Sequence, residues 1–114
     1  MKESEILATT YHDIMDVIRS EDVEDPVSHL TESQNTTIHT SILCELDKES
    51  EAFLGDGVAG LVTSYIVFTR PEIDVIEGDR LKVKHLGRVY DCIAGLPFKF
   101  PSHLEIPVTL KERV

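Results

Sequence analysis

The segment that decides the fold is Glu72–Gly95, EIDVIEGDRLKVKHLGRVYDCIAG. Within it, Arg80–Lys84 alternates charged and apolar residues, which places the cations on one face of a strand and the apolar side chains on the other. Gly87 supplies the positive φ that a tight hairpin turn requires. Val89–Ile93 is rich in β-forming residues and is predicted as the return strand. The segment therefore predicts a twisted antiparallel ribbon, and it carries no catalytic signature.

Turn and proline signals divide the remaining chain into further short strands. The predicted strands are Ala8–Ile18, Thr36–Asp47, Leu61–Arg70, Arg80–Leu86, Arg88–Gly95 and Leu104–Lys111. Pro107 cannot donate to a ladder, so the last strand is predicted to lie at an edge or to be bulged. About six short strands predict an all-β fold, a small antiparallel β-barrel or sandwich with long loops and little helix. We expect one domain over residues 1–114, with residues 1–7 flexible.

Alternation in the three clearest strands predicts the core. The expected core residues are Leu61, Tyr65, Val67, Leu81, Val83, Val89 and Ile93. Two polar segments are predicted as loops: Ser20–Asn35, which is acidic and contains a proline, and Lys48–Gly60, with a helical turn at Glu49–Leu54. Phe53 and Leu54 are unusual in a flexible loop, because loops normally lack apolar side chains. They are expected either to be buried between subunits or to tuck under the barrel.

The net charge of −10 is unevenly distributed. Residues 1–60 hold 14 acidic residues and 3 Lys or Arg, whereas residues 61–114 hold 7 and 8. This pattern indicates either a solvated acidic surface or one that repels phosphate or meets a basic partner. The cations are scattered, which argues against direct nucleic-acid readout. The sequence shows no apolar run of the roughly 20 residues that a membrane helix needs, and no signal peptide, so we expect a soluble intracellular protein.

Motifs for catalysis, phosphate binding and metal binding are missing from the sequence. The glycines near residues 55–60 do not match a phosphate loop, and the five histidines form no metal-ligand motif. Asp74 and Asp79 flank a turn and are interpreted as turn and cap hydrogen-bond acceptors. Cys44 and Cys92 fall in predicted strands and are expected to be free, buried thiols, with a disulfide or a reactive thiol as the alternatives. We therefore expect a protein that is not an enzyme and has no cofactor or metal.

The order of features resembles a known family. A Tyr-His-Asp strand opens the chain, a Cys-containing strand and a flexible segment follow, and Thr69-Arg70-Pro71 ends the next strand. After these come Asp74-Val75-Ile76-Glu77-Gly78-Asp79-Arg80, Gly87-Arg88-Val89-Tyr90-Asp91 and Ser102-His103-Leu104-Glu105-Ile106. Over residues 9–112 this pattern is similar to the head-tail connector, or head-completion, proteins of tailed bacteriophages and prophages of the PBSX type. The resemblance is strongest over residues 70–106.

The resemblance implies a structural, stopper-like role. Such proteins form rings under the portal or its adaptor in the host cytoplasm, retain packaged DNA and offer a docking face to the tail in the virion neck. By position, the channel or assembly loop would comprise Lys48, Glu49, Glu51, Phe53, Leu54, Gly55, Asp56, Gly57 and Gly60. The motif hairpin would comprise Asp74, Gly78, Asp79, Arg80, Gly87, Arg88 and Tyr90.

The implied partners are the portal or adaptor, the tail proteins and further copies of the chain. DNA would be only the contents of the channel, without sequence-specific binding, and a membrane would play no part. The isolated protein is expected to be monomeric. The alternatives are a tail-completion protein and a stand-alone oligonucleotide-binding barrel. The latter needs a cationic face with aromatic residues, for which the candidates are Arg80, Lys82, Lys84, Arg88 and Tyr90.

Overall fold

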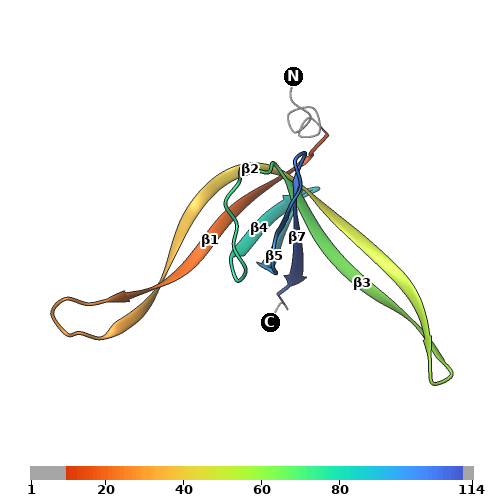
Figure 1. The fold of residues 1–114 in the computed structure, drawn as a ribbon, viewed down its shortest axis with the longest axis horizontal. Helices are drawn as coiled ribbons and strands as arrows, with labels where there is room; N and C mark the ends of the chain where they lie inside the picture. Colours follow the sequence, from red (N-terminus) through yellow and green to blue (C-terminus); the bar gives the residue numbers. More distant parts are fainter. Residues whose placement is uncertain (1–9, 112–114) are drawn as a thin grey trace.

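The computed structural model describes residues 10–111, apart from the side chain of Phe53, and the described chain is all-β as predicted (Figure 1). Every strand pairing is antiparallel. The strands are β1 (Asp13–Glu24), β2 (Thr31–Gly55), β3 (Val58–Thr69), β4 (Arg80–His85), β5 (Arg88–Ala94), β6 (Phe98–Lys99) and β7 (Leu104–Leu110). The expected flexibility of residues 1–7 lies outside the described residues. In residues 10–111, no helix has the length and apolar character needed to cross a membrane.

Six of the strands close into a barrel. The sheet order is β3-β2-β1-β4-β5-β7-β6, and β3 also pairs with β7, which closes the first six strands of this order into a ring. That closing ladder runs from Tyr65 opposite Val108 to Thr69 opposite Leu104. β6 adds a short ladder to β7 outside this ring. Closure pairs the backbone edges that an open sheet would expose to solvent.

The barrel interior confirms part of the predicted core. Val67, Leu81 and Val83 are fully buried, and Tyr65 packs against them from a partly buried position. The prediction is wrong for Leu61, Val89 and Ile93, which are 72%, 53% and 41% exposed. In β5 the buried face instead carries Cys92 and Ala94. The pairing register directs Val89 and Ile93, which alternate with them, outward. The core is completed by Met15, Val17, Cys44, Leu46, Val75, Leu104, Ile106 and Val108.

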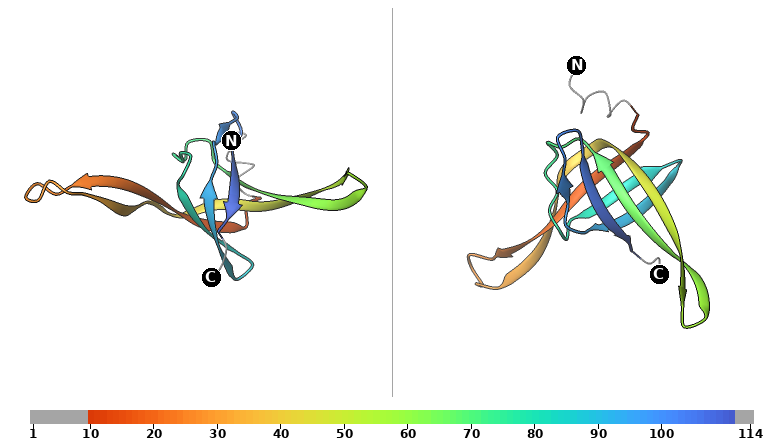
Figure 2. Two further views of the ribbon diagram at one scale, coloured as in Figure 1. Left: turned by 90° about the horizontal axis from the view of Figure 1, so that it is seen from below. Right: turned by 45° about the vertical axis from the view of Figure 1, so that its right-hand side comes forward.

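Two long hairpin ribbons project from opposite sides of the barrel (Figures 1 and 2). We call residues 19–37 the β1–β2 arm and residues 47–64 the β2–β3 arm; both include parts of the 25-residue strand β2. The radius of gyration is 17.0 Å and the extents are 58 × 48 × 28 Å. A compact chain of this length would have a radius of gyration of about 13 Å, so the arms set the outer dimensions of the molecule.

The arms replace the two loops predicted from the sequence. Ser20–Asn35 is not one mobile loop, because only residues 25–30 lie outside the strands. Lys48–Gly60 is also not a loop, because it consists of strand on both sides of a two-residue turn. Glu49–Leu54 is part of β2 and is not helical. Asp56 and Gly57 both have positive φ (51° and 77°), which is the pattern of a type I′ hairpin turn. Neither face of these ribbons packs against the barrel core, so their alternation is a weaker signal than that of a half-buried strand.

Irregular pairing of β2 with β1 sets the direction of the β1–β2 arm. The register shifts between Met15 and Val17 and again before Ile18, so β2 carries extra residues opposite β1. Ser41, in this bulged stretch, has a φ of 53°, and its amide donates to Asp16 Oδ1 at 2.9 Å. The carboxylate therefore satisfies an amide in the bulged stretch. Bulges bend and twist a strand, and here they turn β2 from the barrel wall into the arm.

The predicted edge position of β7 is wrong, for a reason visible at Pro107. β7 pairs with β3 on one side and with β5 on the other. Pro107 lies one residue beyond the last β5 pair, Ala94 opposite Val108, and its carbonyl accepts the Gly95 amide at 2.7 Å. A Cβ on Gly95 would lie 3.1 Å from Pro107 Cγ, so glycine permits this close approach. A proline is tolerated because the ladder with β5 has already ended there.

Cys44 and Cys92 are free and buried, as predicted. Burial raises the pKa of the Cys44 thiol to about 12, with smaller contributions from Asp13 and Glu45. Burial raises the pKa of Cys92 to about 11, with a contribution from Asp91. Both thiols therefore stay protonated near neutral pH, and they act as small apolar core residues.

The core assignment is tested by one aspartate placed on either face of the β4–β5 ribbon. Val83→Asp buries an unpaired charge in the barrel and should lower the free energy of unfolding by about 3–5 kcal/mol. Val89→Asp is the matched control, because this valine is directed outward, and it should change stability by less than about 1 kcal/mol. Urea unfolding followed by circular dichroism measures both. Equal losses would contradict the assigned faces.

Candidate assembly surfaces

The β2–β3 arm is an amphipathic ribbon. Its pairing places Ala52 opposite Leu61 and Leu54 opposite Ala59 on one face. On the other face Glu49 lies opposite Ser64 and Glu51 opposite Val62. Leu54 and Leu61 are 78% and 72% exposed, so Leu54 does not tuck under the barrel. One face of the arm therefore carries leucines and alanines, and the other carries carboxylates together with the exposed Val58 and Val62. Neither face is covered by the described chain.

The structure places the predicted loop residues together on this arm. Lys48, Glu49, Glu51, Leu54, Gly55 and the backbone of Phe53 lie on β2, Asp56 and Gly57 form the tip, and Gly60 lies on β3. Such a ribbon extends far from the barrel, where an isolated pair of strands is marginally stable in water. An exposed apolar face on a marginal element is typical of a surface that a partner covers.

The predicted motif hairpin is anchored by a buried carboxylate. Asp79 is 1% exposed, and it accepts the Arg19 guanidinium through two bonds, Nε–Oδ1 at 3.0 Å and Nη2–Oδ2 at 2.9 Å. Asp79 Oδ2 also accepts the amide of Ile76 at 2.9 Å. Asp74, which is exposed, accepts Arg19 Nη1 at 3.3 Å. The hydrogen bonding that Arg19 donates to Asp79 is the largest cause that raises the pKa of Arg19 above its usual range.

This arrangement confirms the turn role predicted for Asp79, and it adds a partner, Arg19, that sequence reasoning missed. The side chain of Asp74 contacts Arg19 instead of a turn amide. The Asp79 amide donates to the Ile76 carbonyl at 3.2 Å, and Gly78 has a φ of 94°, as a type II turn requires. Arg19 lies at the root of the β1–β2 arm, 60 residues earlier in the chain. The ion pair therefore fixes the arm root to the turn before β4. No local signal in the sequence pairs these two residues.

The remaining motif residues divide between the two faces of the β4–β5 ribbon. Arg80 pairs with Asp91 on the outer face, with Nη2–Oδ2 at 2.6 Å, and this contact is the main cause that lowers the pKa of Asp91. Gly87 and Leu86 form the turn, both with positive φ. Arg88 is exposed, whereas Tyr90 packs against the core and lies edge-on to His85 at 6.0 Å. Arg88 and Tyr90 lie on the same face of β5, and the structure separates Tyr90 from Arg80, Lys82 and Lys84 on the outer face of β4.

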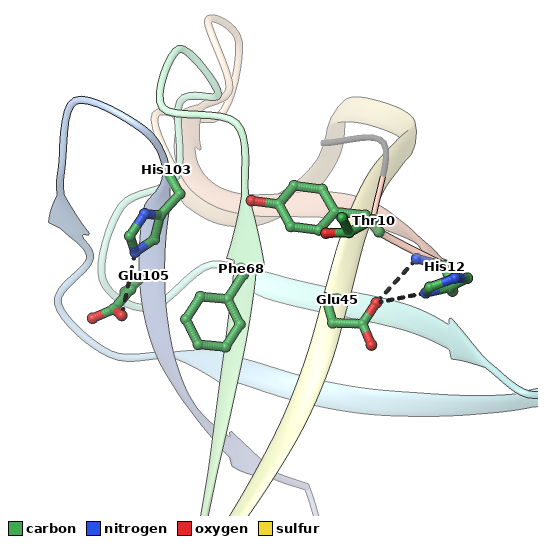
Figure 3. A pocket seen from close by; sticks show the side chains of 7 residues that line it. Thr10, His12, Glu45, Phe68, His103 and Glu105 are labelled. Carbon is green, nitrogen blue, oxygen red and sulfur yellow. Dashed lines mark hydrogen bonds and ion pairs between the residues drawn. The ribbon is translucent and has the colours of Figure 1, made fainter. Parts of the chain in front are cut away.

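A hollow of about 500 Å³ lies near the N-terminal end of β1 (Figure 3). Its lining residues are Thr10, Tyr11, His12, Glu45, Phe68, His103 and Glu105. Figure 3 shows Phe68 between two histidine–carboxylate pairs. His12 Nδ1 lies 3.4 Å from Glu45 Oε2, and His103 Nε2 lies 3.3 Å from Glu105 Oε1. Burial raises the pKa of Tyr11, with smaller contributions from Cys44 and Glu45.

The histidines and carboxylates of this hollow are held by neighbouring groups, whereas the buried Tyr11 hydroxyl has no hydrogen-bond partner among the described residues. Glu45 also accepts the backbone amide of His12 at 3.0 Å, and Ser102 Oγ lies 2.8 Å from His103 Nδ1. Within residues 10–111 no group of three or more His, Cys, Asp or Glu side chains is placed to hold a metal ion. His39 and His85 are partly exposed strand residues, and the backbone carbonyl of His103 accepts the Phe100 amide at 2.8 Å in a turn.

Sequence reasoning also missed the β1–β2 arm, because its residues were assigned to a loop. Five acidic side chains lie on it: Glu21, Asp22, Glu24, Asp25 and Glu32. At its tip Asp25 Oδ1 accepts the amides of Val27 and Ser28 at 2.8 and 3.4 Å, bonds that lower the pKa of Asp25. This Asx-turn, preceding a proline, was the local signal for a hairpin here. Val27 and Leu30 beside it are 88% and 65% exposed.

Comparison with known proteins adds a structural likeness. No family model matches the sequence, and no curated protein matches it. The fold is similar to that of the phage-like element PBSX protein xkdH from Bacillus subtilis, with a TM-score of 0.57 and 12% sequence identity. The likeness covers 90% of this chain and 96% of that chain. At this identity it shows a shared fold, and the fold is that of a protein from a phage-like element.

The Arg19–Asp79 anchor is tested by paired substitutions at the two carboxylates. Asp79→Ala leaves a mostly buried guanidinium and the Ile76 amide without their acceptor, and it should cost about 3–5 kcal/mol of unfolding free energy. Asp74→Ala removes only an exposed contact of the same arginine and should cost less than about 1 kcal/mol. Denaturant titration measures both. A small, equal effect of the two substitutions would show that the anchor contributes little.

Proposed function

We propose that this chain is a structural protein of a phage or prophage neck. It assembles as a ring under the portal or adaptor, retains packaged DNA and provides the docking face for the tail. Assembly takes place in the host cytoplasm, and the protein remains in the virion neck. The shared fold with a protein of a phage-like element supports this proposal. The chain has no catalytic role in it, and it needs no cofactor.

The observation that carries the proposal is the amphipathic β2–β3 arm. A closed barrel needs no such extension for its own stability, because the core lies inside the six-stranded ring. Leu54 and Leu61 lie on the same face of the ribbon and expose most of their side chains. Burying them against a neighbouring subunit or the adaptor would gain about 1.5–3 kcal/mol for each leucine. The arm is therefore the element that assembly would order and cover.

The acidic face of the same arm suits contact with a DNA channel. Glu49 and Glu51 lie on the face opposite the leucines, and Asp56 lies at the tip. Carboxylates facing a channel repel phosphate, so that DNA slides without binding. In a ring, the leucine face would meet protein and the carboxylate face would meet the channel. This division of one ribbon gives the arm a role in both assembly and DNA retention.

A tail-completion protein would differ from the proposed stopper-like protein only in its position within the neck. The oligonucleotide-binding alternative receives less support, because the inward position of Tyr90 leaves Arg80, Lys82 and Lys84 without the predicted aromatic. A gel shift with single-stranded DNA at low salt distinguishes the classes. Tight binding would favour the binding module over the neck protein.

Removing the apolar face of the arm tests the proposed role. Leu54→Ser with Leu61→Ser should leave the melting temperature of the monomer unchanged within about 2 °C, because both side chains already face solvent. In the phage that encodes the chain, filled heads carrying this variant should leak DNA or fail to join tails. Leu86→Ser with Leu96→Ser is the control, since these leucines are also exposed but lie outside the arms. Normal heads with the Leu54→Ser, Leu61→Ser variant would contradict the proposal.

The isolated protein is expected to be a monomer at micromolar concentration and physiological salt. Its net charge of −10 opposes self-association, and the proposed ring forms on a template. Sedimentation velocity should give a single species that is more extended than a compact 12.8 kDa protein, because of the arms. A stable closed ring without any partner would argue against templated assembly.

A further inference from the structure

The outward face of β1, β4 and β5 contains a basic hollow. It has a volume of about 390 Å³, and its lining residues are Ile14, Asp16, Ser41, Lys82, Lys84 and Val89. The strand register places Lys84 between Ile14 and Val89, and Lys82 between Asp16 and Asp91. Ile14 and Val89 are 44% and 53% exposed. The hollow therefore combines two lysines with two apolar side chains on adjacent strands.

The acids near this hollow are already engaged by other groups. Asp16 accepts the Ser41 amide at 2.9 Å, and Asp91 forms an ion pair with Arg80 at 2.6 Å. Lys82 and Lys84 are both exposed, and neither forms an ion pair with the carboxylates of residues 10–111. Lys82 does lower the pKa of Asp91 at longer range, after the larger effects of Arg80 and Lys111. The ligand that fits the hollow is thus anionic with an apolar part.

The β1–β2 arm has that chemistry. Pairing of Val23 with Glu32 and of Glu21 with Gln34 places Glu21, Val23 and Glu32 on the same face of the ribbon. Neither Glu21 nor Glu32 has an ion-pair partner in the described chain, and Val23 is 44% exposed. A carboxylate–valine–carboxylate surface complements a surface of two lysines flanked by isoleucine and valine.

The arm cannot reach the hollow of its own chain. β1 begins beside the hollow at Ile14 and runs outward into the arm, so Val23 lies about 30 Å along the strand from Ile14. Figures 1 and 2 show the arm directed away from the barrel in each view. The complementary surfaces can meet only between two molecules.

We propose that the β1–β2 arm of one copy docks through Glu21, Val23 and Glu32 in the Lys82–Lys84 hollow of the next copy. The contact joins two different surfaces of the chain, so it repeats from copy to copy as a ring or an open filament. Its biological role rests on the proposed neck function, whereas the contact itself is a property of the purified protein. Because it depends on exposed charges, it is weak and sensitive to salt in isolation. It is therefore compatible with a monomer at micromolar concentration.

The contact is tested by carbodiimide crosslinking, which joins carboxylates to amines. Equal amounts of ¹⁵N-labelled and unlabelled full-length protein are mixed at millimolar concentration and low salt. Mass spectrometry then identifies links between one labelled and one unlabelled peptide as intermolecular. We expect such links between Glu21 or Glu32 and Lys82 or Lys84, and a decrease of at least about fivefold at high salt.

Charge reversal tests the same contact without crosslinking. The face variant is Lys82→Glu with Lys84→Glu, and the arm variant is Glu21→Lys with Glu32→Lys. At the millimolar concentration and low salt used for crosslinking, sedimentation of each variant alone should show no association. An equimolar mixture should associate under the same conditions, because each arm then meets a hollow of opposite charge. Lys99→Glu is the control. It reverses the charge of an exposed lysine on β6, outside both arms and away from the hollow, and should associate like the unmodified protein.

Several outcomes would overturn the proposal. Crosslinks from Glu49 or Glu51 to Lys82 or Lys84 would show that the β2–β3 arm, and not the β1–β2 arm, docks in the hollow. Amide signals of Lys82 and Lys84 that shift with duplex DNA, and not with protein concentration, would assign it to nucleic acid. Failure of the mixed variants to associate would also refute it. These results do not depend on the head assay with Leu54 and Leu61, so the contact and the neck function can fail separately.

Discussion

The closing ladder between β3 and β7 is the constraint on which the rest of the structure depends. Without it, β3 would be one edge of an open sheet, β7 with the two-residue strand β6 would be the other, and the inner face would have no covering layer. With it, inward residues such as Val67 and Ile106 are fully buried inside a single ring of strands. Closure needs the chain after β5 to approach β7 closely. Gly95 permits this approach to Pro107, because it has no side chain. The barrel thus obtains one continuous core from short strands.

The closed barrel makes the two arms possible. Each is an extension of strands that are already fixed in the barrel wall, so its root is rigid even though its outer part contacts only solvent. The β1–β2 arm is held further at its root by Arg19 and the buried carboxylate of Asp79. Bulges beside Asp16 and Ser41 set its direction. The β2–β3 arm, by contrast, continues a regular ladder from Cys44 to Gly55.

Charge is distributed over this framework in a way that suits assembly. The acidic residues of the first half of the sequence lie largely on the arms, and the outer face of β4 carries Arg80, Lys82 and Lys84. A single copy cannot bring these surfaces together. Long-range repulsion between copies, which have a net charge of −10, opposes contact except where an arm meets a basic face. Such a pattern favours oriented contacts over non-specific aggregation.

The sequence by itself determined the all-β class, the β4–β5 ribbon with its turn at Gly87, and the burial of Val67, Leu81 and Val83. These features depend on local alternation and turn chemistry, which neighbouring residues report directly. The Asp56-Gly57 turn of the β2–β3 arm could have been predicted from the same rule. The tertiary structure alone decided the inward face of β5, the arms, the partner of Asp79 and the position of Pro107. Each depends on pairing between residues far apart in the chain, and one step of register exchanges the buried and exposed faces of a strand.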